Sequence, residues 1–146
     1  MAVLASLMIP EMARGKADDP STESQLVVEV DGVRRPKGQM CLSVFESDRG
    51  FPSSSGDAVQ NKCVAVTTGL QVIQIQGLKP GSYAVAVLHD ANGDQKANRN
   101  GLGIPMEGFG FSRNPTIRFR VPRFNETAIA VKGKQTKIQI RLNHLI

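Results

Sequence analysis

The sequence predicts an all-β protein: an antiparallel β-sandwich of about seven short strands with one long structured loop. Three observations predict this fold. Short segments rich in Val and Ile alternate polar with apolar residues, Gly and Pro turns separate them, and no long segment repeats its apolar residues at the helical period. Because no helices alternate with the strands, a parallel sheet is excluded. A five-stranded OB-type barrel is the alternative, and the larger number of expected strands disfavours it.

The first half of the chain supplies four expected strands. Residues 25–30 (QLVVEV) alternate, and residues 39–46 (QMCLSVFE) place Met40, Leu42 and Val44 on one face and Cys41, Ser43 and Phe45 on the other. A loop precedes residues 57–62, for which we expect one short helical turn. The third and fourth strands are expected at residues 63–67 and 71–76, and Val72 leaves the register of the fourth open.

The second half adds three more strands. A turn of the x-Pro-Gly type leads into residues 82–89 (SYAVAVLH), whose two faces are both largely apolar, so this strand is expected to be central. Two further strands are expected at residues 126–131 and 135–142. The predicted core comprises Leu26, Val28, Leu42, Val44, Tyr83, Val85, Val87, Ile138 and Ile140.

The segment from residue 90 to about residue 122 is irregular, with five glycines and three prolines. A loop of this length is unusual in a compact domain and is often functional. We expect it to be ordered, because Leu102, Ile104, Phe109 and Phe111 can anchor it. Residues 98–100 are expected at its exposed tip.

Composition limits the classes of function. The chain has 146 residues, 40% of them hydrophobic, which suits one globular domain. Its net charge of +5 is scattered and lacks the interleaved aromatics of an RNA-binding sheet, so nucleic acid is not an expected partner. No apolar run approaches the ~20 residues of a transmembrane helix.

The first nine residues are apolar, and small residues follow near Ala17. We interpret residues 1–24 as the remnant of a secretory signal peptide and a linker, although no basic residue precedes the apolar run. A loosely docked N-terminal arm is the alternative. On the first interpretation the protein is periplasmic or extracellular, and the domain covers residues 25–146.

Cys41 and Cys63 are the two cysteines of the chain. Two ligands cannot make a zinc site, and a catalytic cysteine would need His89 or His144 as its base. In an exported protein we expect one disulfide, which would stabilise by about 3 kcal/mol in the chain-entropy model. In a cytosolic protein, two buried thiols are the expectation.

Residues 77–85 (GLKPGSYAV) resemble the hairpin of transthyretin-like sandwiches. Residues 89–94 (HDANGD) followed by residues 103–112 (GIPMEGFGFS), with Phe45 and the Phe51-Pro52 pair upstream, resemble the bacterial domain-of-unknown-function family 2141. The resemblance extends from about residue 25 to the C-terminus. It implies an exported single domain with a transthyretin-like or immunoglobulin-like sandwich. It implies no activity, because the family has none established.

The segment that begins at Asp90 has a candidate calcium site. Oxygen-bearing side chains at alternate positions can converge on one hard cation. Gln95 and Gly101 stand where an EF-hand has Gly and Glu, so the alternative is a turn held by Asx hydrogen bonds. The candidate ligands are Asp90, Asn92, Asp94 and Asn98.

His89, Asp90 and Glu107 could form an acid–base group, which would make the protein a metal-dependent or hydrolase-like enzyme. Neighbouring strand residues point to opposite faces, however, so His89 and Asp90 do not share a pocket within a strand. The preferred interpretation is that His89 anchors the loop and that Glu107 pairs with an arginine.

Two side-chain clusters in the long segment could bind a ligand. Phe109 and Phe111 form either an aromatic ligand surface or anchors that offset the entropy of ordering the loop. The second cluster, which either binds an anionic polymer or forms a solvated basic edge, comprises Arg113, Arg118, Arg120 and Arg123.

The preferred function is a non-enzymatic binding or structural module of the cell envelope. An envelope protein or a polysaccharide is the expected partner. The candidate binding residues are His89, Glu107, Phe109, Phe111 and Arg113.

Overall fold

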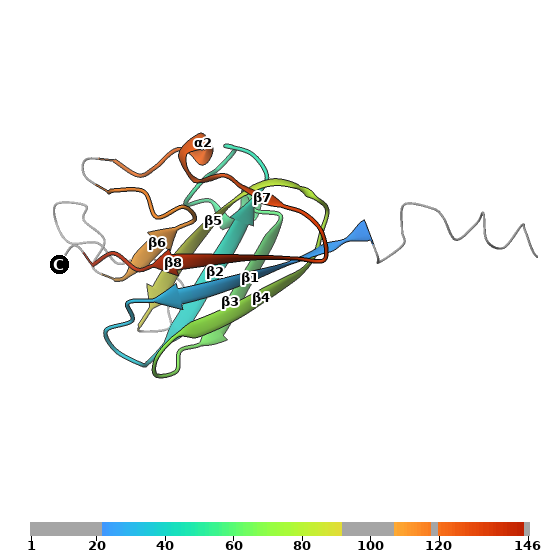
Figure 1. Cartoon of the computed structure of the whole chain (residues 1–146). Coiled ribbons are helices and arrows are strands. Elements are labelled where there is room, and N and C mark those ends of the chain that lie inside the picture. The colour runs from blue at the N-terminus through green and yellow to red at the C-terminus, as the bar shows by residue number, and fades with distance from the viewer. Residues whose placement is uncertain (1–21, 92–106, 118–119, 145–146) are drawn as a thin grey trace, which may run out of the picture.

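Two β-sheets packed face to face form the protein in the computed structural model, which describes residues 22–91, 107–117 and 120–144 (Figure 1). A 3₁₀ turn (Ser55–Asp57) and a one-turn helix α2 (Phe124–Thr127) are the helical elements of these ranges. The strands are β1 (Ser24–Asp31), β2 (Gln39–Phe45), β3 (Gln60–Ala65), β4 (Gln71–Leu78), β5 (Gly81–Asp90), β6 (Phe109–Phe111), β7 (Ile129–Val131) and β8 (Gln135–Arg141).

The first sheet has the order β4-β1-β8, and the second has the order β3-β2-β5-β6, with β7 also paired to β5. The predicted all-β sandwich is therefore confirmed. One expectation was wrong, because β1 and β8 run parallel. The turn after β7 lies beside the start of β1, where the Gln25 amide donates to the Lys134 carbonyl, so β8 begins there and runs in the same direction.

The space between the two sheets holds one apolar core. The predicted core residues are buried, with Ile138 only partly so, and burial of this apolar surface is the main stabilising contribution. In β4, Ile73 and Ile75 face the core while Val72 is 53% exposed, which settles the register that the sequence left open.

Three local predictions were wrong. Residues 60–62 belong to β3, because pairing with β2 outweighs their local helical tendency. Residues 126 and 127 lie in α2, where a Glu126 carboxylate oxygen accepts the Arg123 amide and caps the helix. The segment expected to be irregular contains β6, a three-residue strand. No helix in the described ranges is long and apolar enough to span a membrane.

Candidate functional site

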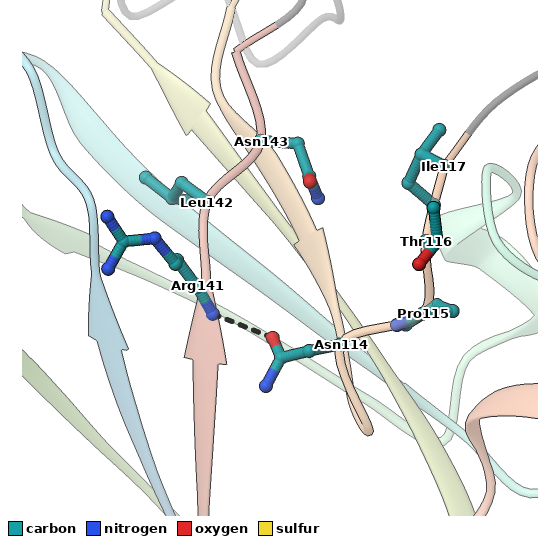
Figure 2. A pocket seen from close by; sticks show the side chains of 7 residues that line it. All are labelled: Asn114, Pro115, Thr116, Ile117, Arg141, Leu142 and Asn143. Carbon is teal, nitrogen blue, oxygen red and sulfur yellow. Dashed lines mark hydrogen bonds between the residues drawn. The ribbon is translucent and has the colours of Figure 1, made fainter.

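An open hollow of about 350 Å³ lies where the end of β8 meets the chain that follows β6. Figure 2 shows residues 114–117 along one side and residues 141–143 along the other, with the Thr116 and Asn143 side chains between them. Among the residues that the structure describes, those that line it are Asn114, Pro115, Thr116, Ile117, Arg141, Leu142 and Asn143.

The side chain of Asn114 joins the two sides of this hollow at one end. Its Nδ2 donates to the Gln139 carbonyl at 3.0 Å, and its Oδ1 accepts the Arg141 amide at 2.8 Å. The amide group thus imitates a peptide of a neighbouring strand and satisfies the outer edge of β8. Asn114 has a φ of +46°, which asparagine tolerates better than most residues, and it completes the reversal of the chain after β6.

At its other end the hollow lies beside the junction of the two sheets. The Asn143 amide donates to the Phe109 carbonyl at 2.6 Å, and the Phe109 amide donates to the Asn143 carbonyl at 3.2 Å. The Asn143 side-chain Nδ2 also donates to the Phe109 carbonyl. These bonds tie the end of the first sheet to β6 in the second, so one side of the hollow is held in place.

Five phenylalanines hold the chain after β6 against the outer face of the second sheet. The Phe51 ring lies 5.3 Å from that of Phe45, 6.0 Å from Phe111 and 6.2 Å from Phe124, and Phe109 contacts Phe111. Edge-to-face pairs of this kind stabilise beyond their buried area. Phe109 and Phe111 are both buried, which favours the interpretation that they are anchors.

Ser112 fixes the start of the same segment. Its Oγ accepts the Val85 amide at 3.0 Å and donates to the Thr127 carbonyl at 2.5 Å, and its own amide donates to the Val85 carbonyl. Ser112 therefore completes the edge of β5 between the stretches that pair with β6 and β7.

The group predicted around His89 lies at the end of β5. The Nε2–H of His89 donates to the Lys37 carbonyl at 2.7 Å, and a Glu107 carboxylate oxygen accepts the Ala91 amide at 2.9 Å. His89 and Asp90 are both buried, on opposite faces of the strand. The bond to Lys37 favours an anchoring role for His89. Glu107 also holds the start of the long segment, through its bond to the Ala91 amide.

Three of the four predicted calcium ligands, Asn92, Asp94 and Asn98, lie outside the described residues, as do the predicted loop tip and residues 1–21. Within the described ranges, no three His, Cys, Asp or Glu side chains come together as a metal site would require. The calcium hypothesis therefore stays a prediction.

The basic cluster is partly neutralised within the described residues. Arg120 forms a two-pronged ion pair with Glu126, at 2.8 and 3.0 Å. Arg113 is exposed and its guanidinium donates weakly, at 3.5 Å, to the Asn125 carbonyl. Arg118 lies outside the described ranges. This ion pair makes Arg120 a weaker candidate for anion binding than the sequence suggests.

The ion pair with Arg120 lowers the pKa of Glu126, which can be measured. Hydrogen bonds from Arg120, and then from the Arg123 amide, lower the pKa of Glu126 from 4.5 to about 2. Because the pKa of Glu126 is lower in the folded state, the ionised Glu126 carboxylate adds fully to the free energy of unfolding above pH 4.5. This contribution is lost as the pH falls toward 2. We expect NMR titration to show this pKa, and Arg120→Met to raise it toward 4.5. Arg49→Met, at a separate ion pair with Asp57, should leave it unchanged. A wild-type pKa near 4.5 would contradict this prediction.

Cys41 and Cys63 are joined in a disulfide directly across β2 and β3. This is the pairing expected for an exported protein.

Thr116 and Asn143 were missed by the sequence reasoning. The available signal was the Asn114-Pro115 dipeptide, which is typical of a turn, but it does not reveal the distant β8 that faces it.

The comparisons with known proteins identify a family. A family model described as "Uncharacterized protein conserved in bacteria (DUF2141)" matches residues 28–139. No curated protein and no solved structure matches the chain significantly.

Proposed function

Because the chain belongs to DUF2141, a family of uncharacterised proteins conserved in bacteria, we propose a function from its own geometry: an exported module that binds polysaccharide. The Cys41–Cys63 disulfide supports export, because disulfides persist in oxidising compartments and are rare in the cytosol. The apolar residues 1–9 support it as well. Recovery of the protein from the cytoplasm with Met1 intact and both thiols free would contradict export.

The observation that carries the proposal is the chemistry of the hollow. The seven lining residues that the structure describes carry amide, hydroxyl, guanidinium and apolar groups, and none of these seven is a carboxylate, imidazole or thiol. General acid–base catalysis most often uses a group of those kinds. The lining therefore favours binding through hydrogen bonds over hydrolysis.

An acetamido-bearing polysaccharide of the envelope suits this lining. Its hydroxyl and acetamido groups match the Thr116 hydroxyl and the Asn143 amide, which lie on opposite sides of the hollow. The Arg141 side chain points away from Thr116 and Asn143 in Figure 2, toward Asp31 of β1, with which its guanidinium pairs at 3.5 Å, so it places no charge between the two sides of the hollow. Pro115 and Ile117 add apolar contact for sugar rings.

Sedimentation with purified peptidoglycan tests this proposal. Thr116→Arg places a long side chain in the hollow, and we expect at least a tenfold loss of bound protein. The matched control is Thr68→Arg, because Thr68 is exposed and precedes β4, at the opposite edge of the first sheet from β8. Equal binding by the two variants, or no binding by the wild type, would contradict the proposal.

A further inference from the structure

The strand β3 is held to the sandwich with little help from the apolar core. None of its six residues is fully buried, and its core contact comes from the partly buried Val64. The neighbouring β2 buries four of its seven side chains, including Leu42 and Phe45. Apolar burial stabilises in proportion to area, so it contributes far less to the position of β3 than to that of β2.

Backbone pairing with β2 at six positions, side-chain polar contacts and one covalent bond supply the remaining attachment. The Ser43 hydroxyl bonds the Asn61 side chain at 2.7 Å. Gln60 and Lys62 donate from β3 to main-chain carbonyls on the edge of β4, at 2.7 and 2.8 Å. All three bonds are exposed, where water competes with them. The Cys41–Cys63 disulfide stands near the middle of the β2–β3 pairing and is the covalent connection between these strands.

The two cysteines differ in exposure. Cys63 is exposed on the edge strand, whereas Cys41 is half-buried on β2, between β3 and β5. Thiol–disulfide exchange needs direct approach of a thiolate to one sulfur, so access selects the atom that is attacked.

We infer that this disulfide is a site of thiol–disulfide exchange with a dithiol, and that its reduction releases β3 while the rest of the sandwich stays folded. The attacking thiolate bonds Cys63 Sγ and breaks the S–S bond, and Cys41 leaves as a thiolate that takes up a proton. The second thiol of the reductant then attacks the reductant's first sulfur, which is bonded to Cys63 Sγ in the mixed disulfide, and Cys63 leaves as a thiolate that takes up a proton. The dithiol is oxidised to a disulfide, and the protein gains two electrons and two protons.

Release of β3 exposes two strand edges at once. β2 loses the partner of residues 39–44, and the Gln74 and Gln76 carbonyls of β4 lose the side chains that bond them. An unpaired strand edge is a template for another strand. Figure 1 shows β3 beside β4 at the seam where both edges would open.

Hydrogen exchange measured by mass spectrometry, with dithiothreitol as the reductant, tests the release. After complete reduction we expect exchange of residues 60–65 to accelerate at least tenfold, while β1 and β5 keep their protection. The double variant Cys41→Ser/Cys63→Ser should show the same pattern without reductant. Unchanged protection of residues 60–65, or equal loss of protection in both sheets, would overturn the inference.

A monothiol tests the attacked atom separately. Brief treatment with glutathione followed by acid quenching should trap a mixed disulfide mainly at Cys63, which peptide mapping identifies. Trapping mainly at Cys41 would overturn the assignment of Cys63 as the attacked sulfur.

Discussion

Gly38→Ala is expected to lower the free energy of unfolding by at least about 3 kcal/mol, because the backbone there has no room for a side chain. Gly38 has a φ of +76°, and an added Cβ would lie 2.6 Å from the Ala91 Cα and against the Asp90 carbonyl. Relief by backbone movement is restricted, since the Val66 amide bonds the Gly38 carbonyl and His89 bonds the neighbouring Lys37 carbonyl. Chemical denaturation of the variant measures the loss.

Gly69→Ala is the matched control. Gly69 has a φ of +84°, but no atom lies within 4 Å of its added Cβ. Both variants carry the cost of a left-handed alanine, about 1–2 kcal/mol, and only Gly38→Ala adds the contact with β5. Equal losses in the two variants would show that the junction of residue 38 with Asp90 and Ala91 is not closely packed.

Phe45→Ala is expected to cost about 3–5 kcal/mol, the usual range for a large aromatic side chain removed from a packed site. Phe45 is fully buried on the face of β2 that points away from the main core, and it contacts the Phe51 ring at 87°. Its loss opens a cavity beside Phe51, whose ring also lies against Phe111 of β6 and Phe124 of α2. Thermal and denaturant unfolding measure the cost.

Phe124→Ala provides the comparison for the same aromatic cluster. Phe124 is only partly buried, and its ring lies 6.2 Å from that of Phe51, so we expect a loss less than half as large. If Phe45→Ala lowers the free energy of unfolding less than Phe124→Ala does, the five phenylalanines do not pack as a core centred on the buried Phe45.

Residues 39–44 could be predicted from the sequence because their burial follows local alternation: Met40, Leu42 and Val44 are buried and the residues between them are only partly so. Residues 82–89 could be predicted as a central strand for another reason, because both of their faces are apolar and the structure buries residues of both. The strand β3 could not be predicted in full, because its polar residues 60–62 are extended only through pairing with β2. The strand β6 could not be predicted because Gly110 interrupts its alternation of side chains. The structure requires glycine there, since an added Cβ would lie 2.6 Å from the Ile140 side chain.

The hollow could not be predicted from the sequence for a different reason. Asn114 meets Gln139 and Arg141 across 25 and 27 residues of chain, and nothing local to either segment encodes that meeting. The motif around His89 was visible because its residues are close in sequence. The contacts of His89 with Lys37 and of Glu107 with Ala91 fit loop anchoring, a role that residue type alone does not distinguish from acid–base chemistry.

NMR titration of the ¹⁵N-labelled, disulfide-bonded protein with soluble peptidoglycan fragments tests the proposed binding site most directly. We expect saturable chemical-shift changes of the Thr116 and Asn143 backbone amides and of the Asn143 side-chain amide, all of which belong to residues that line the hollow. The amide resonances of Thr68 and Gly69, which lie between β3 and β4, should not shift. If these resonances do not shift, or if only resonances of residues outside the hollow shift, the hollow is not the binding site.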